Sequence, residues 1–190
     1  MKKYPCCFAI HRAADAVLDL RADGLRPEEV ESIAIRAPAG AYSPLNRDWA
    51  ETGLEGKFSM RYAIAAALLD GRLGLDAFTD KAVRRPEVRE LMRVVSWTED
   101  PSIEGGDNPI EGGWVDVEVV AGGRRLERRV EQPLGAPGRP LNTEQLAAKF
   151  LDCARGVLPE AQAAAALDGL RRVDSLSDVH GLVASLVSPA

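Results

Sequence analysis

The spacing of apolar residues along the chain has two periods, one typical of helices and one typical of strands. Helical spacing predicts an amphipathic helix over residues 11–20, and the N-cap and N3 spacing of Asn142 and Gln145 predicts a helix over residues 143–155. An almost wholly apolar stretch predicts a central core helix over residues 58–70. Further helices are expected at residues 75–82, 86–93, 160–171 and 175–186.

Period-two alternation predicts the strands. Valines alternate with acidic residues over 115–119, the Gly122-Gly123 pair supplies a turn and the pattern resumes over 126–130, so we expect a hairpin with one solvent-facing side. Two more strands are expected at 30–36 and 94–98. Because helices and strands do not alternate strictly, we expect the α+β class, with a small, mostly antiparallel sheet of about four strands and helices packed on it.

Composition narrows the class of protein. The 190 residues are 46% hydrophobic and 28% charged, with a net charge of -5, and the arginines are scattered, so nucleic acid is not an expected partner. The longest apolar run is too short to cross a membrane and no leader follows Met1, so we expect a cytoplasmic protein that does not bind membranes. The adjacent Cys6 and Cys7 favour reduced thiols, and Cys153 is expected in the core.

The opening residues gather cations, thiols and one of only two histidines. His11 stands where a helix is expected to begin and can act as an acid or a base, although a structural buried histidine is the more frequent case. A thiol of Cys6 or Cys7 can be acidified there, although a small apolar role in the core is more frequent. Two adjacent cysteines do not provide the ligands of a zinc site or an iron–sulfur cluster, so we expect no metal and no cofactor.

Three segments carry a more specific pattern. The first is KKYPCCFAIH at residues 2–11, the second is GKFSMRYAIAAALLDG at 56–71, and the weaker third runs through QPLGAPGRPL at 132–141 to Lys149-Phe150. Together they resemble the MmgE/PrpD family, which includes 2-methylcitrate dehydratase and, more distantly, cis-aconitate decarboxylase and iminodisuccinate epimerase. The resemblance implies that residues 1–190 form one domain, the C-terminal α+β domain of that family, without the all-helical N-terminal domain that normally precedes it.

The resemblance also implies a site. It assigns catalytic roles to Lys2, His11 and Tyr62, and substrate contacts to Cys7 and Ser59. Lys3 takes the role of Lys2 if the register differs by one residue. The decarboxylase branch has a histidine at the position of Cys7, which makes decarboxylation of cis-aconitate less favoured here.

The implied function is that of a hydro-lyase similar to 2-methylcitrate dehydratase of propionate catabolism, which eliminates water from a hydroxy-tricarboxylate by acid/base chemistry. The implied partners are a small carboxylic acid and an all-helical domain or subunit, and homodimer formation stays open. Without that helical part we expect the isolated chain to be weak or inactive, because half of the cleft would be missing. The alternatives are a family epimerase or isomerase acting next to a carboxylate, and a non-catalytic domain that binds a carboxylate or a partner protein.

Overall fold

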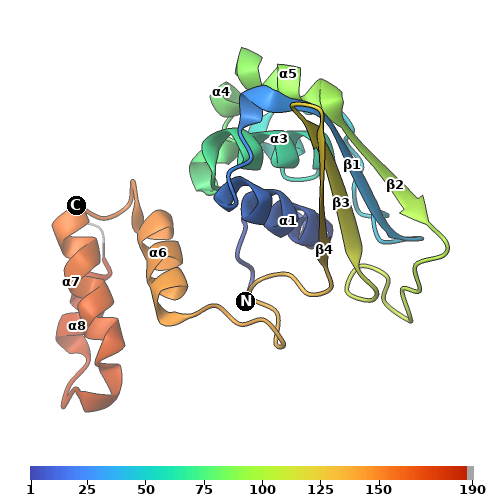
Figure 1. Ribbon diagram of the computed structural model, residues 1–190. Coiled ribbons are helices and arrows are strands. Elements are labelled where there is room, and N and C mark those ends of the chain that lie inside the picture. The colour runs from blue at the N-terminus through green and yellow to red at the C-terminus, as the bar shows by residue number, and fades with distance from the viewer. Residues whose placement is uncertain (188–190) are drawn as a thin grey trace. The chain divides into compact units, whose positions relative to one another are not determined.

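The computed structural model describes residues 1–187. Contacts divide the chain into two compact units, Met1–Pro140 and Leu141–Ala190. The first unit contains a four-stranded sheet with helices on one of its faces, and the second consists of helices (Figure 1). The expected α+β class is confirmed.

The sheet has the strand order β2-β1-β3-β4. Its strands are β1 (Val30–Pro38), β2 (Val95–Asp100), β3 (Val115–Ala121) and β4 (Arg124–Val130). The β1–β3 and β3–β4 pairs are antiparallel, whereas β1 and β2 are parallel. The mostly antiparallel sheet is therefore confirmed, with one parallel pair. The parallel pair arises because the chain leaves β1, passes through several helices and returns in the same direction, a connection that parallel strands require.

Three helices cover the inner face of the sheet (Figure 1). They are α1 (His11–Ala22), α3 (Met60–Asp70) and α5 (Pro86–Val94). The valines that alternate along β3 are buried against them, as the sequence pattern predicts. Residues 62–68 of α3 are also buried, which confirms its central position. Gly71 ends α3 with a φ of 68°, a left-handed conformation that favours glycine.

The helix expected over residues 75–82 is wrong as a single element. The chain forms a 3₁₀ turn at Leu75–Phe78 and then the short helix α4 (Asp80–Val83). Thr79 lies between them in an extended conformation, and its hydroxyl oxygen accepts a hydrogen bond from the Ala82 amide at 3.1 Å. A side-chain cap therefore interrupts the apolar periodicity and starts a new helix. The other short elements are the helix α2 (Gly53–Gly56) and 3₁₀ turns at Phe8–Ile10, Pro27–Glu29 and Val173–Ser175.

The second unit contains α6 (Thr143–Ala154), α7 (Glu160–Arg171) and α8 (His180–Ser185). Asn142 and Gln145 form a capping box at the start of α6, the N-cap and N3 pair that predicts a helix there. The helix expected over 175–186 is wrong in its first half, where a 3₁₀ turn and an extended stretch precede α8. Cys153 is exposed rather than in the core, because the buried positions of α6 are taken by Ala147 and Ala154.

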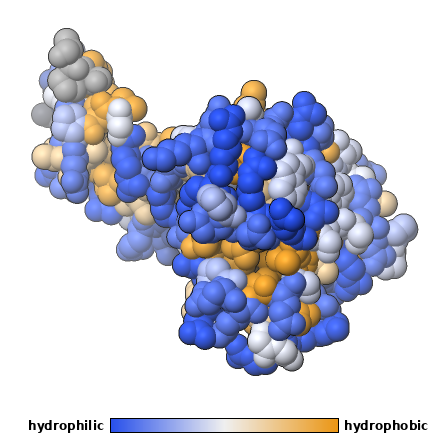
Figure 2. Space-filling model, turned by 90° about the horizontal axis from the view of Figure 1, so that it is seen from above, coloured by the Kyte–Doolittle hydropathy of each residue, from blue (hydrophilic) through white to orange (hydrophobic). Residues whose placement is uncertain are grey.

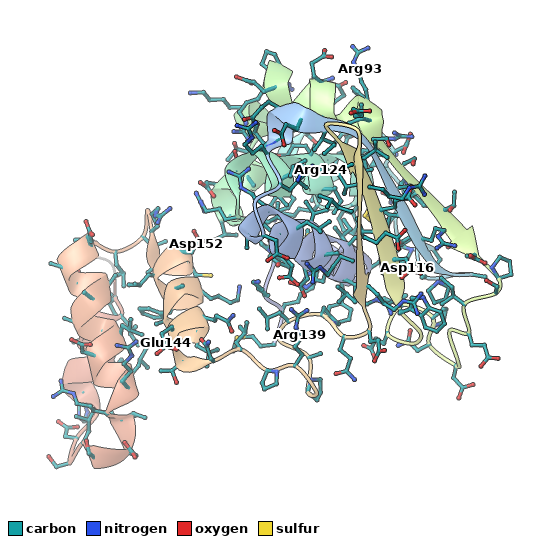
Figure 3. The ribbon with its side chains drawn as sticks, viewed as in Figure 1. Arg93, Asp116, Arg124, Arg139, Glu144 and Asp152 are labelled. Atoms are coloured by element: carbon teal, nitrogen blue, oxygen red, sulfur yellow. The ribbon has the colours of Figure 1, made fainter. Side chains whose placement is uncertain are left out.

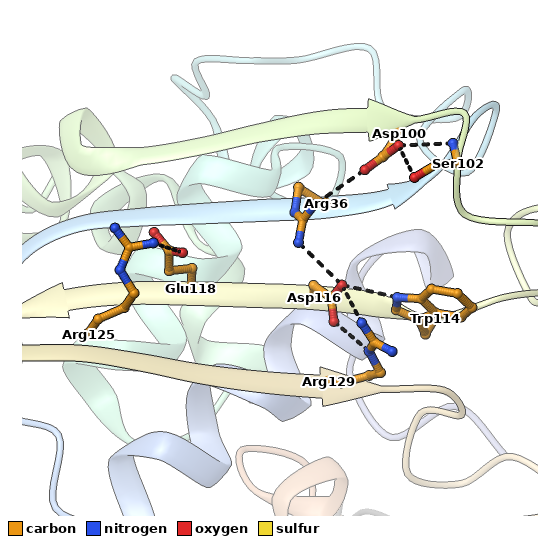
Figure 4. Close-up of polar contacts among 8 residues, drawn as sticks. All are labelled: Arg36, Asp100, Ser102, Trp114, Asp116, Glu118, Arg125 and Arg129. Carbon is orange, nitrogen blue, oxygen red and sulfur yellow. Dashed lines mark hydrogen bonds and ion pairs between the residues drawn. The ribbon is translucent and has the colours of Figure 1, made fainter.

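The outer face of the sheet carries a charged ladder, shown in Figure 4. Arg36 on β1, Asp116 on β3 and Arg129 on β4 occupy directly opposed positions of the register. Asp116 accepts hydrogen bonds from Arg129 at 2.7 and 3.0 Å and lies 3.5 Å from a nitrogen of Arg36. Elsewhere, Figure 2 shows a hydrophobic patch on the first unit between hydrophilic side chains.

Candidate functional site

A cleft of about 430 Å³ lies in the first unit where three separate segments meet. Its lining residues come from the chain start, from the loop before β3 and from the loop after β4: Met1, Lys2, Phe8, Glu111, Gln132, Pro133, Gly135, Ala136, Pro137 and Gly138. The first and third segments of the sequence resemblance thus lie against one another. The backbone nitrogen of Met1 donates a hydrogen bond of 2.6 Å to the Gly135 carbonyl oxygen and joins them directly.

The two opening lysines have different surroundings. Lys2 is exposed and lines the cleft. Lys3 lies over the Tyr4 ring at 4.8 Å, and its Nζ is 3.6 Å from a carboxylate oxygen of Asp15. Burial lowers the pKa of Lys3 although the nearby Asp15 carboxylate opposes that shift. Lys2, rather than Lys3, therefore lines the cleft.

Asp15 is a buried carboxylate in the middle of α1, with its side chain 2% exposed. It accepts hydrogen bonds of 2.5 Å from the Tyr4 hydroxyl and 2.5 Å from the Leu134 amide, and 3.3 Å from Arg139. Burial and the negative charge of Asp15 together raise the pKa of Tyr4. Figure 3 labels Arg139, which comes from the loop after β4. Buried charges are stable in a fold only when they are paired and hydrogen-bonded, as Asp15 is.

Arg12, also 2% exposed, is the second buried charge of α1. Its guanidinium donates hydrogen bonds to the carbonyl oxygens of Gly112 at 2.8 Å and Ile110 at 3.0 Å, and to those of Pro109 and Gly113 at 3.3 Å. Burial lowers the pKa of Arg12. These contacts fix the loop that presents Glu111 to the cleft.

His11 is fully buried at the start of α1. Its ring lies 5.1 Å from the ring of Tyr4 and 5.1 Å from that of Phe8. Phe8 lines the cleft and His11 does not, so the Phe8 ring lies between His11 and the cleft. The structure therefore does not bring His11 and Lys2 together at one surface.

Tyr62 and Ser59 lie at the start of α3. The Ser59 hydroxyl accepts a hydrogen bond from the Tyr62 amide at 3.2 Å and donates one to the Asp48 carbonyl at 2.9 Å, so Ser59 caps the helix. The Tyr62 hydroxyl donates to the Ala77 carbonyl oxygen, and burial raises its pKa to about 12. Both side chains are buried away from the residues that line the cleft.

The two opening cysteines join the first and second segments of the resemblance. The amide of the half-buried Cys7 donates a hydrogen bond of 2.8 Å to the Lys57 carbonyl, just before α3. Cys6 is buried, and burial, with Cys7 nearby, raises the pKa of its thiol to about 12. A thiol with such a pKa is not a thiolate near neutral pH, which argues against Cys6 as a nucleophile.

Arg12, Asp15 and Glu111 are absent from the site that the sequence predicts. A signal for the first two exists, because they are charged residues three positions apart in a helix otherwise rich in alanine. The amphipathic pattern predicted for residues 11–20 hides this signal, since it assigns charged residues to solvent. In the structure residues 11–17 are all buried.

Between residues 1 and 187, no cluster of three or more His, Cys, Asp or Glu side chains is arranged to hold a metal ion. Over the same range, none of the helices has the length and apolar character needed to cross a bilayer.

Comparison with known proteins shows similarity to one protein family. The profile of the MmgE/PrpD C-terminal domain matches residues 4–174. Cis-aconitate decarboxylase of Mus musculus is 28% identical over 199 residues, with 100% of this chain and 39% of that protein covered. The proteins of the same name from Aspergillus terreus and Homo sapiens are 25% and 26% identical over 202 and 196 residues, again with 100% of this chain and 40% of each relative covered. The chain therefore spans about two fifths of the length of these relatives.

Proposed function

The chain belongs to the MmgE/PrpD family, and on that premise we propose that it forms the C-terminal part of a lyase that eliminates water from a hydroxy-tricarboxylate of the 2-methylcitrate type. The observation that carries this proposal is the position of Lys2 on the cleft, where the family-like segment at residues 2–11, to which it belongs, meets the segment at 132–141. A small polycarboxylate is the ligand class that matches an exposed ammonium group in a cleft of this size.

In the proposed reaction, a C–H bond next to a carboxylate breaks, its electrons form the new C=C bond, and the hydroxyl leaves as water after protonation. Lys2 pairs with the substrate carboxylate and stabilises the negative charge that develops on it. Glu111 is the acidic side chain on the same cleft and is placed to exchange a proton with the substrate. His11 supports this surface by packing against Phe8, and Tyr62 stabilises the core through its hydrogen bond to the Ala77 carbonyl.

A helical partner domain belongs to this proposal. The relatives extend well beyond the region that matches this chain. Apolar side chains are exposed in the segment around Lys57, whose carbonyl accepts a hydrogen bond from Cys7, with Leu54 at 70% and Phe58 at 36%. A partner that covers them would also exclude water from the reacting groups. We therefore expect strong turnover only when the helical part is supplied.

Decarboxylation of cis-aconitate is the second candidate, favoured by the names of the relatives. In that reaction a C–C bond to one carboxylate breaks, a proton replaces the carboxylate and carbon dioxide leaves. The identities of 25–28% leave room for a different reaction on a similar tricarboxylate. Cys7, in place of the histidine of the decarboxylase branch, is the reason to rank dehydration first.

The test is turnover by the chain together with its helical part. With 2-methylcitrate, dehydration produces a conjugated alkene that absorbs in the ultraviolet. With cis-aconitate, decarboxylation releases carbon dioxide. An epimerase would change optical rotation without either signal, and a non-catalytic domain would only bind. Either of these last two outcomes would exclude the proposed lyase.

The Lys2→Gln variant tests the residue that carries the proposal. We expect it to lower kcat/KM by about a hundredfold, the scale of losing one charged donor to a developing anion. Lys81→Gln is the matched control, because Lys81 is an exposed lysine of α4 outside the cleft. Undiminished turnover by Lys2→Gln would contradict the assignment of this residue.

A further inference from the structure

We infer that Arg12 and Asp15 of α1 are positioning residues, which hold the two loops of the cleft in the arrangement that receives a carboxylic acid. The identity of the ligand, a carboxylic acid, rests on the proposed function, whereas the anchoring of the loops by Arg12 and Asp15 does not. The two residues are three positions apart, so they lie on neighbouring points of one helix surface.

Asp15 anchors the loop after β4 and the chain start at once. Its two carboxylate oxygens have different partners. One accepts a hydrogen bond from the Tyr4 hydroxyl, and the other accepts hydrogen bonds from the Leu134 amide and Arg139. Both segments contribute to the lining of the cleft, the chain start through Met1, Lys2 and Phe8 and the loop after β4 through residues between Gln132 and Gly138. A single buried carboxylate thus sets the distance between two of its walls.

Arg12 anchors the third wall. Its guanidinium reaches four carbonyl oxygens within residues 109–113, a turn of the loop before β3. A lysine could not replace it there, because an ammonium group has three donors and lacks the planar fork of five N–H groups. The loop is also held by close packing, since a Cβ on Gly112 would lie 1.9 Å from the Gly105 carbonyl oxygen.

Anchoring the two loops also fixes the side chains that would contact the ligand. Glu111 and Gln132 are exposed side chains, one on each anchored loop, and they line the cleft with Lys2. Loops without regular structure are ordinarily the most mobile parts of a fold. Anchoring them on a buried helix lowers the ordering cost of binding, which is the effect of preorganisation on affinity.

The first experiment uses Asp15→Asn, which keeps the shape and removes the charge. We expect the Leu134 amide to exchange with solvent at least about tenfold faster, because a charge-assisted hydrogen bond is lost. We also expect the affinity for citrate, used as a probe tricarboxylate, to fall about tenfold. Asp19→Asn is the matched control, since Asp19 is one turn along α1 and its carboxylate lies 3.4 Å from Arg139, whereas the hydrogen bonds of the Tyr4 hydroxyl and the Leu134 amide go to Asp15.

A second readout separates positioning from general weakening of the fold. Lys3 faces the carboxylates of Asp15 and Asp19 on α1, the Tyr4 ring, and the guanidinium of Arg139 from the loop. Asp15 opposes the lowering of the Lys3 pKa, so in Asp15→Asn the Lys3 side chain should lose its proton at a lower pH than in the wild type. Side-chain NMR of Lys3 follows this titration.

Arg12→Lys tests the other anchor. We expect faster amide exchange across residues 109–113 and weaker citrate binding, with the Leu134 amide unchanged. Arg21→Lys is its control on the same helix, because Arg21 donates instead to the Leu68 carbonyl, away from the cleft. Independent responses of the two loops would show that each residue holds its own wall.

The outcomes decide the two proposals separately. Unchanged Leu134 exchange in Asp15→Asn overturns the inference, whatever citrate does. Faster exchange in a chain whose wild type does not bind citrate supports the anchoring and counts against the carboxylate ligand. If Asp15→Asn does not fold, Tyr4→Phe removes one donor to Asp15 while keeping the ring against His11, and the same exchange increase, reduced to a few-fold, is required of it.

Discussion

At the scale of single residues, Tyr62 is a side chain that could act as an acid or a base but is packed into the core. Its hydroxyl donates to the Ala77 carbonyl and its ring lies 5.9 Å from that of Phe78. A Cβ on Gly56 would come within 2.7 Å of the Tyr62 ring, so the packing around it is tight. The surroundings of Tyr62 are therefore those of a structural residue.

Tyr62→Phe should lower the free energy of unfolding by about 1–2 kcal/mol, because the Ala77 carbonyl loses its donor inside the core. Denaturant unfolding followed by circular dichroism measures this change. Tyr42→Phe is a useful contrast, since the buried Tyr42 hydroxyl has no hydrogen-bond partner among the residues that the structure describes. Its removal should be neutral or stabilising. A Tyr62→Phe protein of unaltered stability that loses turnover would instead give Tyr62 a chemical role.

The sequence indicates which segments of the chain contribute to the candidate site better than it indicates which individual residues do. Residues of the opening segment and of the loop from Gln132 to Gly138 line one cleft. The role of Arg12 and Asp15 could not be assigned from the sequence, because their loop partners are between 97 and 124 positions away along the chain. Local periodicity reports which face of a helix is apolar, and it carries no information on which distant loop will meet a charge.

At the scale of elements, the loop before β3 depends on its glycines. Gly113 has a φ of 60°, and a Cβ there would lie 2.6 Å from the Glu104 carbonyl oxygen. Gly106 has nearly the same backbone conformation, with a φ of 62°, and open space around it. Substitutions at Gly106 and Gly113 can therefore be compared to distinguish the cost of backbone strain from the cost of steric conflict in one loop.

Gly106→Ala should cost about 1 kcal/mol, the price of left-handed backbone in a residue with a Cβ. Gly113→Ala should cost at least 1 kcal/mol more, because backbone atoms must also move. Thermal or denaturant unfolding of both variants tests the difference. Equal losses would mean that the loop relaxes without resistance, and that Arg12 does not hold it rigidly.

Elements with local signals were predictable. The glycine turn of the β3–β4 hairpin, the capping box of α6 and the glycine end of α3 are all encoded within a few residues. The break at Thr79 and the late start of α8 were not, because apolar spacing continues across both. The parallel pairing of β1 with β2 depends on how intervening helices pack, which is a tertiary effect.

At the scale of the whole molecule, the outer face of the sheet links three strands through Asp116. Partial burial tends to raise the pKa of this carboxyl group, but hydrogen bonds from Arg129 and Trp114 and the charge of Arg36 outweigh it, so the pKa is lowered. A lowered pKa in the fold contributes stability above the unfolded value of about 4 and loses it as the pH falls below that value.

Asp116→Asn should therefore lower the unfolding temperature at pH 7 and make it less sensitive to acid below about pH 4 than in the wild type. Unfolding temperatures across a pH series measure both effects. Asp107→Asn, in an exposed position of the loop before β3, is the control. A parallel acid response of Asp116→Asn and wild type would show that the ladder does not contribute to acid sensitivity.

The strand order also leaves β4 at an edge of the sheet, with one row of backbone donors and acceptors not used by a neighbouring strand of the sheet. Exposed edges of this kind invite strand-to-strand aggregation. Four of the seven residues of β4 are arginines. An incoming strand would have to desolvate guanidinium groups along β4, so we expect these arginines, one of which completes the charged ladder, to oppose strand-to-strand association of the domain.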